Sequence, residues 1–169
     1  NPAVVANGSA LAPSDVLDVS ETDGLKINGD SNHSIGITSD WGAPVAGTGD
    51  QVGYDIYTNG GATLIVDADI VVNVNEPPTV GLTNVVASLP EDTDTSSAVK
   101  VADIVITDEA SGINDLTLTG TDAASFEIVG SELMLKAGTS LDYETKTSYD
   151  VTVQVDDATV GATPDDTVS

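Results

Sequence analysis

The sequence contains no cysteine, so no disulfide can staple the fold. It also lacks arginine, and besides one histidine its only basic side chains are four lysines. Against these stand 28 aspartates and glutamates, which give a formal net charge of −24. A surface of this sign repels phosphate backbones and anionic lipids, which argues against nucleic acid as a partner. Divalent cations would reduce the repulsion between the acidic side chains and could stabilise the fold in place of disulfides.

Long hydrophobic runs are also absent. No stretch approaches the ~18 apolar residues of a membrane-spanning helix, and we expect no membrane insertion. The chain starts Asn1-Pro2-Ala3 without Met or a basic n-region, so no signal peptide is visible. We expect a processed product or a piece of a longer protein. Nucleophile elbows, phosphate-binding loops and histidine-based metal motifs are all missing, and we expect no enzyme.

The sequence is rich in short runs of Val, Ile, Thr and Leu, separated by Gly, Asn, Asp, Ser and Pro. Such runs, with turn signals about every 8–12 residues, predict an all-β chain built of sandwiches of the immunoglobulin or cadherin type. Its length suits two domains of about 80–90 residues. We predict one β-sandwich domain of uncertain family over residues 1–75 and a second, cadherin-like one over residues 76–169.

Alternation and β-branching predict the individual strands. In the first half they are Ala3–Ala6, Val16–Ser20, Gly24–Asn28, Ser34–Thr38, Gln51–Thr58 and, after a turn at 59–61, Ala62–Val74. In the second half they are Val80–Leu89, Ala98–Thr107, Asp115–Thr119, Phe126–Val129, Glu132–Lys136 and Ser148–Val155. A seventh strand barely begins at Thr167–Ser169, so we expect the second sandwich to lack its last strand.

The joint between the halves, residues 73–78, carries side-chain oxygens and ends in two prolines. Proline has no N–H and a fixed φ, so it ends sheet pairing and stiffens the crossing. An extended, oxygen-rich joint of this kind suits a hard cation held between two β-domains. We therefore take Asn73, Asn75 and Glu76 as candidate ligands of Ca²⁺.

Four acidic clusters in the second half, at 89–92, 107–115, 141–144 and 153–157, have the same oxygen-rich character. Their candidate ligands are Glu91, Asp108, Asn114, Asp142, Glu144, Asp156 and Asp157. Asp142 and Glu144 stand two residues apart and would project to one side of an extended backbone. That arrangement suits a cation that takes six to eight oxygens better than it suits an acid/base pair.

Taken together, these residues resemble the cadherin-like repeat of large bacterial calcium-dependent surface adhesins. The resemblance covers residues 73–157. It rests on Pro-Glu at 90–91, the Asp-x-x-x-Gly-x-Asn run at 108–114, Leu-Asp-Tyr-Glu at 141–144 and the strand 149–157. The chain departs from the family at Asn73 and Glu76, where aspartate is usual, and at Ala110, which replaces an acid.

The resemblance implies calcium at the joints between successive domains, bound from both sides, which makes a rod rigid. It implies that Asp108, Asn114 and either Asp157 or Asp156 turn toward the 73–76 linker. It also implies that Glu91, Asp142 and Glu144 lie at the opposite pole of the second domain, facing a following joint.

Our leading hypothesis is a non-enzymatic extracellular module, either a calcium-stiffened rod segment or a subunit of a surface filament. Its partners would be neighbouring repeats or other copies of the chain, head to tail, and also cell-surface glycans or proteins. Polymerisation by strand donation is a minority version, because residues 3–11 are small and apolar enough to fill a neighbour's missing strand. The alternative is a carbohydrate-binding module that stacks sugars on Trp41, Tyr54 and Tyr57. For Trp41 a core position is the competing interpretation.

A weaker metal signal lies at 28–32, where oxygens alternate as in an EF-hand loop. The loop lacks the required glycine, replaced by His33, and the glutamate at its twelfth position. We interpret His33, the only histidine, as a loop residue.

Overall fold

The computed structural model describes residues 24–109 and 112–169. In this part of the chain the fold is all-β, as predicted, with three short 3-10 turns, Ser39–Trp41, Gly49–Gln51 and Ala123–Ser125. The chain divides into two compact units. Unit 1 comprises Asn1–Pro77 with the short segments Glu109–Gly112 and Ala158–Gly161, and unit 2 comprises the remainder. The domain limits 1–75 and 76–169 stay a prediction. Within the described ranges, no helix is long and apolar enough to cross a membrane.

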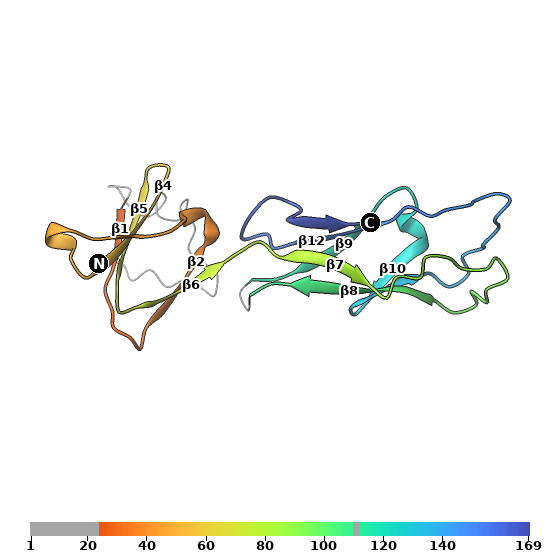
Figure 1. Cartoon of the computed structure of the whole chain (residues 1–169), viewed down its shortest axis with the longest axis horizontal. Coiled ribbons are helices and arrows are strands. Elements are labelled where there is room, and N and C mark those ends of the chain that lie inside the picture. Colours follow the sequence, from red (N-terminus) through yellow and green to blue (C-terminus); the bar gives the residue numbers. More distant parts are fainter. Residues whose placement is uncertain (1–23, 110–111) are drawn as a thin grey trace. The chain divides into compact units, whose positions relative to one another are not determined.

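In its described residues, unit 1 contains two sheets (Figure 1). Its strands are β1 (Gly24–Ile27), β2 (Ser34–Thr38), β3 (Val45–Ala46), β4 (Tyr54–Asn59), β5 (Ala62–Asp67) and β6 (Val71–Asn75). One sheet has the order β1-β5-β4-β3, and the other pairs β2 with β6. The β4–β5 hairpin is antiparallel, whereas β1 runs parallel to β5 and β2 runs parallel to β6. Unit 1 therefore mixes parallel and antiparallel pairs.

The core of unit 1 receives side chains from both sheets. Leu64 and Val66 of β5 are 0% exposed, and Ile37 of β2 is 1% exposed. Trp41 belongs to the same cluster and is 2% exposed, as is expected for a ring that closes a sandwich core. The core position for Trp41 is thus confirmed.

Two strand predictions in unit 1 are wrong. The strand expected over residues 62–74 is interrupted between Asp67 and Val71 by a turn. In this turn the Ile70 N–H donates to the Asp67 carbonyl at 2.9 Å, and the Asp69 N–H donates to Asp67 Oδ1 at 3.2 Å. The Asp67 side chain thereby offers the backbone an alternative to sheet pairing. The strand expected from Gln51 begins only at Tyr54. The predicted strands at 3–6 and 16–20 and the proposed donor segment 3–11 lie outside the described residues.

Unit 2 also contains two sheets (Figure 1). Its strands are β7 (Thr79–Thr83), β8 (Val99–Thr107), β9 (Asp115–Thr119), β10 (Phe126–Val129), β11 (Glu132–Leu135), β12 (Thr152–Asp156) and β13 (Asp166–Val168). The sheet orders are β10-β11-β8-β7 and β13-β12-β9. All of these neighbouring pairs are antiparallel.

The core of unit 2 follows the two-residue period of its strands. Val153 and Val155 on β12 are 0% exposed, and Leu133 and Leu135 on β11 face them from the other sheet at 3% and 2%. Phe126 adds an edge-to-face ring contact, with its centroid 6.0 Å from that of Tyr149. Apolar side chains from both sheets therefore fill one layer, which makes unit 2 a sandwich.

Two strands of unit 2 are shorter than predicted. The first ends at Thr83 instead of residue 89, because Asn84 adopts a positive φ of 50° that breaks the extended backbone. The strand expected from Ser148 begins only at Thr152, because residues 148–151 do not pair with a neighbouring strand. The last strand, β13, is three residues long and begins at Asp166, one residue before the predicted Thr167.

The buried leucine of β5 offers a direct test of the unit 1 core. Leu64→Ala should lower the free energy of unfolding of unit 1 by about 2–5 kcal/mol, because it leaves a cavity in a packed cluster. Trp41 fluorescence during denaturant unfolding reports on this core. As a control, Val52→Ala alters a side chain that is 73% exposed and should change stability by no more than about 0.5 kcal/mol. A loss below about 1 kcal/mol for Leu64→Ala would contradict the packing.

Candidate metal centres

The structure brings together three of the predicted ligands, Glu91, Asp142 and Glu144, which we call the three-carboxylate cluster. One ligand oxygen from each side chain lies within 4.8 Å of the other two. All three side chains are exposed. Within residues 24–109 and 112–169 no other group of three His, Cys, Asp or Glu side chains converges in this way.

Local turns position these carboxylates. The Thr93 N–H and hydroxyl both donate to the Pro90 carbonyl, at 3.0 and 2.6 Å, in a turn that presents Glu91. The Tyr143 N–H donates to Glu91 Oε2 at 3.3 Å and so links the two segments. The Thr93 side chain closes this turn by bonding the Pro90 carbonyl, as threonine hydroxyls commonly do in turns.

Asp142 and Glu144 converge for a different reason from the one predicted. They do not stand on an extended backbone, because residues 143–145 form a turn in which the Lys146 N–H donates to the Asp142 carbonyl at 2.8 Å. Asp142 caps this turn. Its Oδ2 accepts from the Thr145 hydroxyl at 2.7 Å and its Oδ1 from the Thr145 N–H at 3.2 Å. These hydrogen bonds stabilise the charged form and lower the pKa of Asp142.

The geometry of the cluster fits a calcium ion. Ca²⁺ binds carboxylate oxygens at about 2.4 Å, so two ligands of one ion lie at most about 4.8 Å apart. The ligand atoms of the cluster meet that limit. Three carboxylates can supply up to six oxygens if they bind in the bidentate mode, which reaches the lower end of the coordination number of Ca²⁺.

The lysines of the chain are engaged elsewhere. Lys100 pairs with Asp103 at 2.5 Å and Glu132 at 2.7 Å, and Lys146 pairs with Asp122 at 2.7 Å. Lys136 donates to the Ala124 carbonyl at 2.9 Å, and the Lys26 ammonium lies 3.8 Å from the centroid of the Tyr54 ring. Among the described residues, no salt bridge therefore neutralises the three-carboxylate cluster.

A second group of oxygens lies where β8 and β12 end, on the far side of unit 2 from the three-carboxylate cluster. Asn114 Nδ2 donates to Asp108 Oδ2 at 2.8 Å, and Asp156 lies opposite Asp115 in the β9–β12 register. Asp157 is only 1% exposed. The buried atoms Asp108 Oδ1, Asn114 Oδ1 and Asp156 Oδ1 have no hydrogen-bond partner in the described part of the chain. An unsatisfied buried acceptor costs about 1–3 kcal/mol, which a bound cation would offset.

Asp165 belongs to this second group although the sequence analysis missed it. Its Oδ2 accepts from the Asp157 N–H at 2.7 Å, and its own N–H donates to the Val155 carbonyl at 3.0 Å. Its other oxygen, Oδ1, is buried without a hydrogen-bond partner among the described residues. The contact joins two positions eight residues apart across a loop, and only the acidic pair at 165–166 signals it in the sequence.

The predicted ligands of the joint lie at the end of β6 and just after it, in unit 1. Asn73 and Glu76 are exposed, whereas Asn75 is 1% exposed and its Nδ2 donates to Thr159 Oγ1 at 3.0 Å. The Glu76 N–H donates to Glu109 Oε1. Calcium at this joint stays a prediction.

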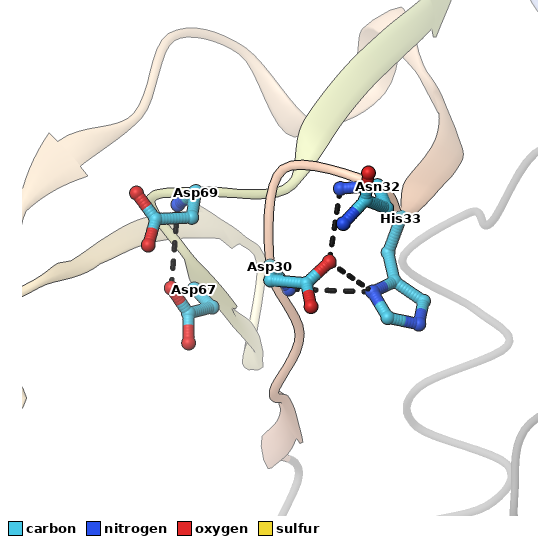
Figure 2. A network of polar contacts seen from close by, with 5 residues as sticks. All are labelled: Asp30, Asn32, His33, Asp67 and Asp69. Atoms are coloured by element: carbon cyan, nitrogen blue, oxygen red, sulfur yellow. Dashed lines mark hydrogen bonds and ion pairs between the residues drawn. The ribbon is translucent and has the colours of Figure 1, made fainter.

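Figure 2 shows the loop with the weaker metal signal. The Asp30 carboxylate accepts from the Asn32 N–H at 2.9 Å and lies 2.9 Å from His33 Nδ1. These contacts, with the Asn32 N–H bond as the larger cause, lower the pKa of Asp30. Asp67 and Asp69 form a separate turn. Asp30 thus closes its own loop, and His33 is a loop residue as predicted.

The aromatic platform of the carbohydrate-binding alternative is not present. Trp41 and Tyr57 are buried in the core, at 2% and 5% exposure. Tyr54 donates its hydroxyl to Asn28 Oδ1 at 2.8 Å, and Lys26 lies over its ring. The predicted platform of three exposed rings is therefore wrong. Large aromatic side chains are more stable when buried, and a small core needs them to fill its volume.

No family model matches the sequence, and no curated protein matches it significantly. Similar solved structures include protocadherin gamma B7 in an EC3–6 cis-dimer structure, with a TM-score of 0.43, 15% identity, and coverage of 80% of this chain and 41% of that chain. A second is protocadherin gamma B2, extracellular cadherin domains 3–6, with a TM-score of 0.43, 18% identity, and coverage of 73% and 40%. This chain spans less than half the length of either. A likeness this distant carries no information about function.

The hydrogen bonds from Thr145 to Asp142 can be tested through the pKa of the Asp142 carboxyl group. Thr145→Ala removes the hydroxyl donor and should raise the pKa of Asp142, as measured by NMR titration of its carboxyl carbon. Because the folded-state pKa is depressed, the cap stabilises the fold above the ordinary aspartate pKa, and this stability is lost as the pH falls through the folded-state value. As a control, Thr147→Ala should leave the titration of Asp142 unchanged. An unchanged Asp142 titration in Thr145→Ala would contradict the capping role.

Proposed function

We propose that this chain is a non-enzymatic extracellular module that binds Ca²⁺ and serves as a stiffened segment of an adhesive rod or surface filament. The observation that carries this proposal is the convergence of Glu91, Asp142 and Glu144 from two separate turns, without a lysine to balance them. The cadherin-like motifs in the sequence, described above, favour the same function.

The register of unit 2 supports a binding site at each end of the sandwich. Thr79 pairs with Thr107, so Asp108 lies where β7 begins. Val86 donates its N–H to Val101 at 2.7 Å, and Glu91 lies beyond that contact, past the start of β8. A cation at each end could bind oxygens of the unit 2 loops and oxygens of an adjacent module at the same time. A module with a binding site at both ends can be stacked head to tail, which is how heterologous contacts build open arrays.

Calcium would also act on the stability of the module. The chain carries a net charge of −24, and self-repulsion of this size opposes the compact state. Each bound Ca²⁺ neutralises two carboxylate charges. A ligand present at a hundredfold excess over its Kd adds about 2.7 kcal/mol to the stability of the state that binds it.

The three-carboxylate cluster can be tested by replacing one carboxylate with its amide, which removes the charge but keeps the shape of the side chain. Glu144→Gln should weaken calcium binding at one site at least about tenfold in isothermal titration calorimetry, because one of three charged ligands is lost. Asp92→Asn removes one charge next to Glu91 but leaves the cluster intact, so it should bind like the unaltered chain. Equal titrations for the two variants would contradict the proposed site and show a diffuse effect of net charge.

The second group is tested through the residue that the sequence analysis missed. Asp165→Asn keeps an oxygen for the Asp157 N–H and removes one charge, so the fold should persist while the affinity of a second calcium site falls. Asp50→Asn, which removes one charge from an exposed position outside both oxygen groups, is the matched control. The melting temperature with calcium and with chelator measures the difference. A calcium-dependent rise of the same size in both variants would exclude Asp165 as a ligand.

A further inference from the structure

Unit 2 contains a groove of about 850 Å³ that reaches into the core of the sandwich. Its lining includes the core side chains of Phe126, Leu133 and Leu135, which are 6%, 3% and 2% exposed. Val85 and Val86 line it as well and are 58% and 42% exposed. Protein interiors are otherwise close-packed, so an apolar space of this size beside exposed valines is suited to the apolar groups of a ligand.

Residues 148–151 also line the groove, and they do not pair with a neighbouring strand. The Asp150 carbonyl accepts from the Asp122 N–H at 2.9 Å, and the Asp150 N–H donates to Asp122 Oδ2 at 2.8 Å. Successive residues of an extended chain direct their backbone groups to alternate edges, so Tyr149 and Val151 face the other way. Within the described ranges no backbone hydrogen bond outside the strands involves Tyr149 or Val151. An added strand can pair with an edge of this kind.

Part of the lining is acidic. The three-carboxylate cluster belongs to it, together with Tyr143, which is 66% exposed. Lys146 is the one basic side chain among the described residues that line the groove, and it pairs with Asp122 at 2.7 Å. The Debye length at physiological ionic strength is about 8 Å, so the cluster acts on a ligand that lies in the groove beside it. These carboxylates favour a ligand that carries a positive charge.

The chain itself does not supply a matching cation. Residues 1–23 contain neither lysine nor arginine. Lys26, Lys100 and Lys136 are engaged in the contacts described above. A second copy carries the same net charge of −24 and would be repelled. Charge complementarity therefore favours a different protein as the occupant of the groove.

We propose that this groove docks an extended segment of another protein, whose backbone pairs with Tyr149 and Val151. Apolar side chains on one face of the segment fill the groove, and a lysine or arginine pairs with Glu91, Asp142 and Glu144. The unused backbone edge favours a polypeptide over a small apolar molecule. The inference goes beyond the proposed function, since it assigns a protein ligand of stated chemistry to the module. It does not require calcium, because an ammonium or guanidinium group would occupy the carboxylates in place of the metal ion.

Three synthetic peptides with blocked ends, titrated by calorimetry in excess chelator, test the docking. Lys-Val-Thr-Val-Thr-Val-Lys has both features, Glu-Val-Thr-Val-Thr-Val-Glu reverses the charge, and Lys-Thr-Ser-Thr-Ser-Thr-Lys removes the apolar face. The first should bind at least about tenfold more tightly than either of the others, because one control loses the charge pair and the other loses the apolar burial. At saturation it should slow amide exchange at Tyr149 and Val151 at least about tenfold. Equal affinities for the three peptides, or binding that leaves exchange at both amides unchanged, would overturn the proposal.

Two variants test the charge pair with the first peptide. Glu144→Gln should weaken its binding at least about threefold, whereas Asp50→Asn removes an equal charge from an exposed position outside the groove and should leave the affinity unchanged. An equal loss in the two variants would show a diffuse effect of net charge and overturn the proposal. Because these titrations contain no free calcium, a failure of the proposed calcium site would leave their outcome unchanged.

The free chain tests the other occupants. Sedimentation at rising concentration should show a monomer whose Tyr149 and Val151 amides exchange faster than that of Val153, which pairs with Val168. Self-association that slows exchange at the first two amides would overturn the proposal, because a second copy would then fill the groove. Equally slow exchange at all three amides in the monomer would also overturn it, because the chain would then cover its own groove.

Discussion

Repulsion between carboxylates is the constraint on which the rest of this structure depends. Twenty-eight acidic side chains share one chain with four lysines, and no disulfide opposes expansion. Two like charges at 4 Å repel by about 4 kcal/mol in the dielectric typical of a protein surface. A chain of this composition can bring carboxylates together only where hydrogen bonds, lysines or metal ions compensate. Lysines compensate one set of acids, and the candidate metal ligands lie among the acids that lack them.

The structural acids have partners within the protein. Asp103 and Glu132 hold Lys100, and Asp122 holds Lys146 while its other oxygen accepts from the Asp150 N–H. The hydrogen bond from Lys146 lowers the pKa of Asp122. The oxygens at the two ends of unit 2 differ. Three carboxylates converge at one end without a lysine, and at the other end buried acceptors have no hydrogen-bond partner among residues 24–109 and 112–169. The proposed calcium-binding module would account for both ends with one kind of ion.

Much of the fold could be predicted, because the period of two in the sequence survives in the structure. The strands Ser34–Thr38, Asp115–Thr119 and Phe126–Val129 have the predicted limits. Prediction failed where a local polar contact replaced sheet pairing, as in the turn of Asp67, and it could not foresee the parallel pairing of β1 with β5. For the candidate sites, the motif predicted Glu91, Asp142 and Glu144 as ligands. It did not predict the local turn in which Thr145 caps Asp142, nor the contact of Asp165 with Asp157 across a loop.

The proposed function requires a cation that binds among Glu91, Asp142 and Glu144. Tyr143 stands between two of these residues and is 66% exposed, so it can sensitise the luminescence of a bound terbium ion, which takes the same oxygen ligands as calcium. Terbium luminescence excited through tyrosine is therefore the most direct measurement, on the unaltered chain and on Tyr143→Phe. We expect sensitised emission that falls when calcium displaces terbium and that is largely lost in Tyr143→Phe. Emission that is absent, that calcium leaves unchanged, or that persists in full in Tyr143→Phe would contradict the proposed function.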